Sequence, residues 1–85
     1  MYVAAMQVTA SQRIASTVRA ELARRRISQT TVGERLGISQ AAVSRRLSGQ
    51  QPLDVNELTA LAGLLDMPVS ALIEDAAPPR LASTA

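Results

Sequence analysis

The 85-residue sequence has no cysteine, histidine, tryptophan or phenylalanine, and Tyr2 is its only aromatic residue. Without cysteine, disulfides and thiolate chemistry are excluded. Without histidine, the chain lacks the commonest metal ligand and the commonest general base. Since no pair of clustered acids and no glycine-rich phosphate loop is present either, we expect no catalytic residues, no metal site and no cofactor, and we expect that the protein is not an enzyme.

Long apolar runs are also absent. No window approaches the roughly 20 apolar residues of a membrane span. The first cation is Arg13, so the start does not resemble a signal peptide, which begins with basic residues before a longer apolar core. We therefore expect a cytoplasmic protein with no membrane partner. The length fits one domain, and the 47% of apolar residues must form an aliphatic core.

The charge is distributed unevenly, and all nine cations are arginines. Residues 11–50 carry eight arginines and two acids, a net charge of +6, whereas residues 51–85 carry one arginine and five acids, a net charge of −4. Arginine pairs bidentately with phosphate and with the edge of guanine. The first half is therefore expected to meet a polyanion. The two acids in that half, Glu21 and Glu34, are interpreted as isolated surface residues.

Caps and apolar spacing predict five helices and no strand. Thr9 and Gln12 form a capping box for a first helix that runs to about Arg25. The next helices are expected at 29–36 and 40–48, and Gly37 and Gly49 are expected to end them. The fourth helix follows a cap at Asp54, and the fifth runs from Val69 to Glu74. The apolar face of the fourth helix is predicted to comprise Val55, Leu58, Leu61, Ala62 and Leu65.

These elements predict a compact all-α domain at residues 11–75. Residues 1–10 are interpreted as an N-terminal extension. Residues 76–85, which contain Pro78-Pro79 followed by serine and threonine, are interpreted as a flexible tail or linker.

The most informative stretch is residues 29–47, QTTVGERLGISQAAVSRRL. Two short helices lie on either side of a turn that contains Gly37, as a helix-turn-helix requires. Gly33 is expected to face the second helix of the pair, where a side chain larger than that of alanine would push the helices apart. Gly37 is expected to make the turn.

This segment resembles the helix-turn-helix of the Cro and lambda-repressor family, also called the Xre type. The residues that carry the resemblance are Gln29, Gly33, Gly37-Ile38-Ser39-Gln40, Val43-Ser44-Arg45 and Gly49, and the likeness extends over residues 12–75. It implies a five-helix, lambda-repressor-like fold and a DNA-binding transcription regulator, a repressor of phage or prophage type in a bacterial or phage-infected cell. Two positions depart from the family. Gly33 replaces the usual alanine at a cost of up to about 1 kcal/mol of helix propensity, and Arg46 stands where an apolar or aromatic residue is usual.

The third helix has a face suited to reading DNA bases. With Val43 and Leu47 facing inward, the outward side is small, neutral or cationic and carries no acid. Arg45 matches the edge of guanine and Gln40 the edge of adenine, with about 1–3 kcal/mol of discrimination for each bidentate pair. The predicted base-reading residues are Gln40, Ala41, Ser44 and Arg45.

Other residues are predicted to contact phosphates. Gln29 and Ser39 lie at helix N-termini, where backbone N–H groups converge on an anion. The resemblance also implies contacts with DNA for Gln29 and Gln40. Because Arg46 departs from the family's apolar position, we expect it to turn toward a phosphate. The full predicted set is Gln29, Ser39, Arg46, Ser48 and Arg26.

Alternatives remain at this point. An antitoxin-type autoregulator uses the same helical domain. A protein-interaction module is also compatible, with the acidic second half or the apolar start, residues 1–8, as its surface. The expected partner is a double-stranded DNA operator, bound by a homodimer or by one domain of a longer repressor with residues 76–85 as linker. No small-molecule substrate is expected.

Overall fold

The computed structural model describes residues 9–76, and it is all-helical over that range. The predicted five-helix, all-α fold is confirmed. The predicted extension and tail lie mostly outside the described residues. The helices are α1 (Ala10–Arg24), α2 (Gln29–Leu36), α3 (Gln40–Leu47), α4 (Val55–Leu65) and α5 (Val69–Ala76).

The first four helices begin at side chains that accept hydrogen bonds from their first turns. The hydroxyl of Ser28 accepts from the N–H of Thr31, and that of Ser39 accepts from the N–H of Ala42, each at 3.1 Å. The helices α1 and α4 begin with capping boxes, in which the cap and the third helical residue bond reciprocally. Each such cap contributes roughly 1 kcal/mol of helix stability, so the starts predicted from short-range sequence patterns are confirmed.

The helix ends depend on left-handed backbone conformations. Gly37 ends α2 with φ 71°, and Gly49 has φ 84° two residues after α3. Both conformations favour glycine because it has no Cβ atom. Asp66 ends α4 with φ 57°, in a conformation that aspartate adopts more readily than most residues. Helix α3 ends one residue before the predicted Ser48, which serves as its C-cap.

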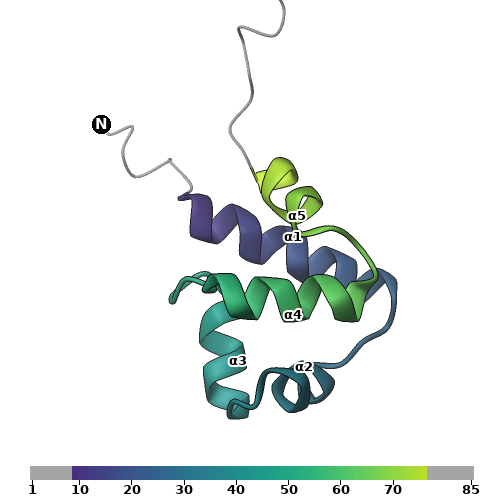
Figure 1. Cartoon of the computed structure of the whole chain (residues 1–85). Coiled ribbons are helices and arrows are strands. Elements are labelled where there is room, and N and C mark those ends of the chain that lie inside the picture. The colour runs from purple at the N-terminus through teal and green to yellow at the C-terminus, as the bar shows by residue number, and fades with distance from the viewer. Residues whose placement is uncertain (1–8, 77–85) are drawn as a thin grey trace, which may run out of the picture.

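Helix α1 packs against α3, α4 and α5, while α2 packs against α3 and α4. Figure 1 shows α5 on one side of the α1 and α4 pair, with α2 and α3 on the other. The helix-turn-helix formed by α2 and α3 is therefore held on a base made by the other helices.

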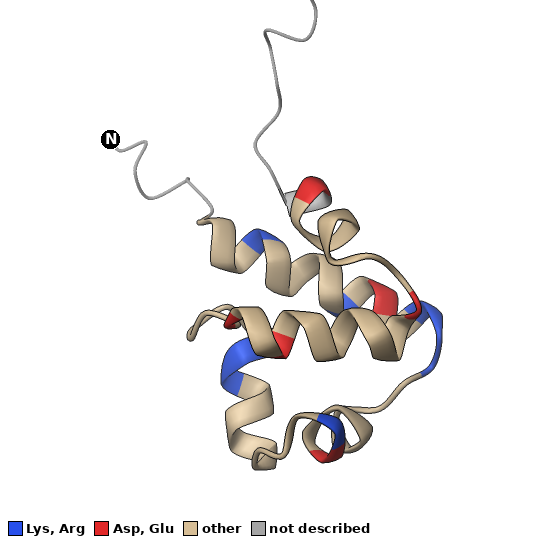
Figure 2. Ribbon diagram, in the orientation of Figure 1, with Lys and Arg blue, Asp and Glu red and all other residues tan. Residues whose placement is uncertain are grey.

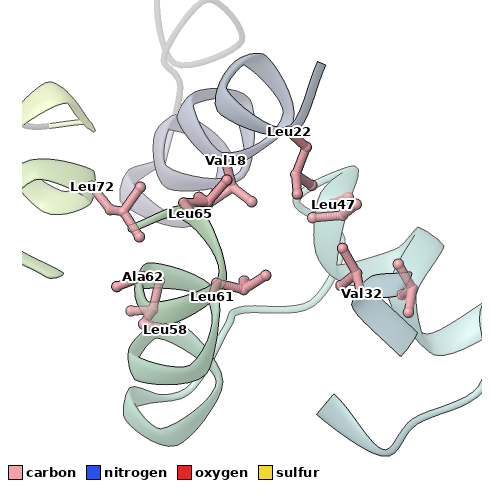
Figure 3. Packing of buried hydrophobic residues seen from close by; sticks show 10 residues of the cluster. Val18, Leu22, Val32, Leu47, Leu58, Leu61, Ala62, Leu65 and Leu72 are labelled. Carbon is pink, nitrogen blue, oxygen red and sulfur yellow. The ribbon is translucent and has the colours of Figure 1, made fainter. Parts of the chain in front are cut away.

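Within residues 9–76 the hydrophobic core contains only aliphatic side chains, since no aromatic residue occurs in that range. Figure 3 shows leucines of α4 directed toward those of α1, α3 and α5. Leu61 and Leu65 are completely buried. The buried cluster comprises Val18, Leu22, Val32, Val43, Leu47, Leu58, Leu61, Ala62, Leu65 and Leu72.

Two predictions about individual side chains are wrong. Val55 was predicted to lie on the apolar face of α4, but its residue is 75% exposed, because it opens the helix one turn before the buried Leu58. Glu21 was predicted to be an isolated surface acid, but its residue is only 8% exposed. The carboxylate of Glu21 accepts hydrogen bonds from Arg25 and, at 3.1 Å, from Arg24.

The hydrogen bond from Arg25 lowers the pKa of Glu21 below its ordinary value of 4.5, with smaller contributions from the charges of Arg24 and Arg25. Burial opposes this shift because it disfavours the ionised carboxylate. The three side chains therefore form a small charged cluster at the end of α1.

We expect Leu61→Ala to lower the free energy of unfolding by about 2–5 kcal/mol, because it leaves a cavity in a closed part of the core. Val55→Ala removes an aliphatic side chain from the same helix at an exposed site and should change the value by less than about 0.5 kcal/mol. Urea unfolding followed by circular dichroism measures both. Equal effects of the two substitutions would contradict this description of the core.

The lowered pKa of Glu21 predicts a pH dependence of stability. A carboxylate whose pKa is lower in the folded chain stabilises the fold above its unfolded pKa, near 4.5, and this stabilisation is lost as the pH falls through the folded pKa. Glu21→Gln should therefore weaken the loss of stability below that pH. Denaturant unfolding across a pH series tests this, with Glu34→Gln on the exposed side of α2 as the control. If E21Q and E34Q flatten the curve equally, the proposed role of Glu21 fails.

Candidate nucleic-acid interface

Helix α3 presents one buried and one exposed side. Val43 and Leu47 are buried in the cluster, as predicted. The opposite side carries no acidic residue, and its exposed residues are Gln40, Ala41, Ser44, Arg45 and Ser48. The structure therefore brings the four predicted base-reading residues and Ser48 together on one open face.

Arg45 is the main charged group on that face. Among residues 9–76, no side chain or carbonyl pairs with its guanidinium. Figure 2 shows the two arginines at the C-terminal end of α3. The backbone of Arg45 is fixed, since its carbonyl accepts from the N–H of Gln50 at 3.0 Å and of Gln51 at 3.2 Å. A held backbone with an unpaired guanidinium suits contact with an external partner.

The two serines predicted to contact phosphate already have internal roles. The hydroxyl oxygen of Ser39 accepts from the N–H of Ala42 as the N-cap of α3, which leaves the hydroxyl proton available to an acceptor. The hydroxyl of Ser48 donates to the carbonyl of Arg45 at 3.1 Å. Donation from Ser48 to a phosphate would require this bond to break.

Gln29 lies exposed at the first position of α2 and lines a hollow between α1, α2 and α3. Arg19 of α1 borders the same hollow and donates a hydrogen bond to the carbonyl of Leu47. The remaining lining residues are Ser44, Leu47 and Ser48. The hollow thus gathers one cation, an amide and two hydroxyls, with no acid among its lining residues.

Arg19 was missed by the sequence reasoning. Its place in the arginine-rich half was visible, but its partner lies 28 residues away in the chain. Arg26, which was predicted, is exposed in the turn between α1 and α2 with φ 57°. It is not one of the residues that line the hollow.

Arg46 is placed differently from its prediction. The side chain of Arg46 does not turn outward. Its Nε donates to Glu57 Oε2 at 2.9 Å, and its Nη1 donates to the carbonyl of Ala42 at 3.2 Å. Its side chain is 15% exposed. The carboxylate of Glu57 and the carbonyl of Ala42 accept charge-assisted hydrogen bonds from the guanidinium, so the cation at the position that departs from the family is engaged within the protein instead of facing outward toward a phosphate.

Gly33 sets the spacing between α2 and α3. A Cβ atom at this position would lie 3.1 Å from the carbonyl oxygen of Ile38 and 3.4 Å from Cγ2 of Val43. The expectation that Gly33 faces the second helix of the pair is confirmed. The close approach lets α3 seat Val43 in the core and so fixes which side of α3 remains open.

The described residues contain no group of three or more potential metal-binding side chains from histidine, cysteine, aspartate and glutamate. None of the helices in the described part of the chain combines the length and apolar character that crossing a membrane needs.

Comparison with known families agrees with the geometry. A helix-turn-helix family model matches residues 18–72, which is more than half of the chain. The match begins within α1, includes the pair α2 and α3, and ends within α5. No curated protein sequence matches the chain.

We expect Gly33→Val to lower both the melting temperature and any DNA affinity, because the added atoms would force α2 and α3 apart. Gly63→Ala in α4 is the control, since a Cβ atom there meets nothing within 4 Å. That substitution should raise the free energy of unfolding by about 0.5–1 kcal/mol through helix propensity. Thermal unfolding measures both variants. A stable G33V variant with an unchanged fold would show that the spacing at Gly33 is not restrictive.

Proposed function

The chain belongs to the helix-turn-helix family of the Cro/C1 type, a family of DNA-binding transcription regulators, and we propose that it is a sequence-specific repressor of phage or prophage type that reads the major groove with α3. The observation that carries this proposal is the unpaired guanidinium of Arg45 on an exposed, acid-free side of the second helix of the helix-turn-helix.

In this proposal the open side of α3 enters the major groove, which is wide enough to admit an α-helix. Arg45 donates two hydrogen bonds to O6 and N7 of a guanine, and Gln40 pairs with an adenine in the first turn of the helix. Ala41 contacts a thymine methyl group, and Ser44 bonds to a base edge between them. These contacts select the sequence, since each side chain matches a particular base edge.

The remaining contacts hold the protein on the duplex. Gln29 at the start of α2 and Ser39 at the start of α3 donate to phosphates, where the helix N-termini favour an anion. Arg26 adds a cation to this set, and Arg19 at the edge of the hollow adds another. Contacts of this kind position a protein without selecting a sequence. Each neutralised phosphate releases counterions, so affinity should fall steeply with added salt.

A repressor of this type acts by occupying its operator, and two copies would bind two half-sites about one helical turn apart. In vitro selection from a random duplex pool tests the proposal directly. Enrichment of a palindrome indicates two copies, whereas a single short site indicates one. If no duplex is enriched at low salt, the DNA-binding proposal fails and the protein-interaction reading is favoured.

We expect Arg45→Ala to weaken binding to the selected duplex by roughly 5- to 150-fold, which corresponds to the loss of about 1–3 kcal/mol of base recognition. Binding to a scrambled duplex of equal length should fall much less, because it depends mainly on net charge. Arg35→Ala removes the same charge from the exposed side of α2 and serves as the control. Fluorescence anisotropy measures all pairs. An equal loss by R45A on both duplexes would exclude a base-reading role for Arg45.

A further inference from the structure

The ion pair between Arg46 and Glu57 joins α3 to α4 across a gap. No Cα atom of α3 lies within 8 Å of a Cα atom of α4, so these helices approach each other only through side chains. Within the described residues, the pair is the one hydrogen-bonded or charged link between them. The side chains of Arg46 and Glu57 are only 15% and 13% exposed.

Both groups of the pair are held by further bonds. Oε1 of Glu57 accepts from the N–H of Asp54 at 3.1 Å, and Asp54 Oδ1 accepts from the N–H of Glu57 at 2.7 Å, which closes the capping box of α4. On the other side, Nη1 of Arg46 donates to the carbonyl of Ala42, one turn earlier in α3. The link therefore joins two fixed points, the start of α4 and the body of α3.

We propose that Arg46 and Glu57 are positioning residues for DNA reading, which hold the last turn of α3 at the orientation that sequence recognition requires. Arg45 is the next residue along α3, and its side chain is on the open face. A tilt of the last turn of α3 would displace the guanidinium of Arg45 from a base edge. Neither Arg46 nor Glu57 would touch DNA.

This inference rests on the proposed function, and it predicts a particular pattern of binding. Bidentate contact with a base edge demands alignment of both hydrogen bonds. Attraction to phosphates is a charge effect that tolerates small displacements of the protein. Loss of the link should therefore reduce sequence discrimination more than it reduces total attraction to DNA.

Glu57→Gln gives the sharpest test, because two explanations predict opposite signs. Removing an acid, and freeing Arg46 to reach a phosphate, would strengthen binding if charge alone mattered. If the pair positions α3, binding to the selected duplex should instead weaken, by about tenfold if one bidentate contact is lost. Glutamine keeps an oxygen for the N–H of Asp54, so the start of α4 can persist.

Arg46→Met combined with Glu57→Gln is the second variant. It removes one charge of each sign, so the net charge of +2 is unchanged, and it leaves no buried charge without a partner. Replacing a buried pair in this way is often neutral or stabilising. We expect this variant to fold and to lose about tenfold in discrimination between the selected and a scrambled duplex, with little change on the scrambled one.

Both variants and the parent protein are first compared without DNA, by amide hydrogen exchange. Faster exchange in the last turn of α3, with the melting temperature retained, is the expected result. Anisotropy titrations with the selected and scrambled duplexes follow. Unchanged exchange in both variants, or tighter binding of E57Q to the selected duplex, overturns the positioning role. If the parent protein binds no duplex, the proposed function fails, and the exchange measurement still decides whether the link holds α3.

Discussion

The helix-turn-helix depends on the close approach of α2 and α3 at Gly33. The space beside its Cα atom is bounded by the carbonyl oxygen of Ile38, in the turn, and by the side chain of Val43 in α3, so there is little room for a side chain at this position. This spacing allows Val32 and Val43 to enter the same cluster. Once that side of α3 is buried, its other side must face solvent. The exposure of Arg45 therefore follows from the packing of its aliphatic neighbours.

The arginines of the basic half have different roles that a charge count does not distinguish. Arg24 and Arg25 bind the carboxylate of Glu21, and Arg46 binds Glu57. These arginines contribute to the fold at short range, and their fields are partly cancelled by their partners. Arg45 has no such partner in the described part of the chain. Glu57 lies outside residues 11–50, so the net charge of +6 there overstates the charge available to a polyanion by the one unit that Glu57 neutralises on Arg46.

The parts of the fold that the sequence predicted are those set by nearby residues. Helix starts at Ser28 and Ser39 depend on bonds three residues along the chain, and the turn at Gly37 depends on its own backbone. Helical periodicity also predicts which side of α3 is buried and which side is exposed. The link between Arg46 and Glu57 was missed because it depends on how α3 and α4 are arranged in space. Contacts with DNA depend on a second molecule as well as on this chain, so helical periodicity alone does not determine them.

The open side of α3 has a consequence for how such a protein can change. The side chains of Gln40, Ala41 and Arg45 contribute little to the buried cluster, which is formed from the other side of the helix. Substitutions at these positions are therefore largely free of a folding penalty. Under the proposed mode of DNA reading, single substitutions on this side would change the preferred DNA sequence without altering the fold, whereas substitutions at Gly33 and in the aliphatic core are limited by packing.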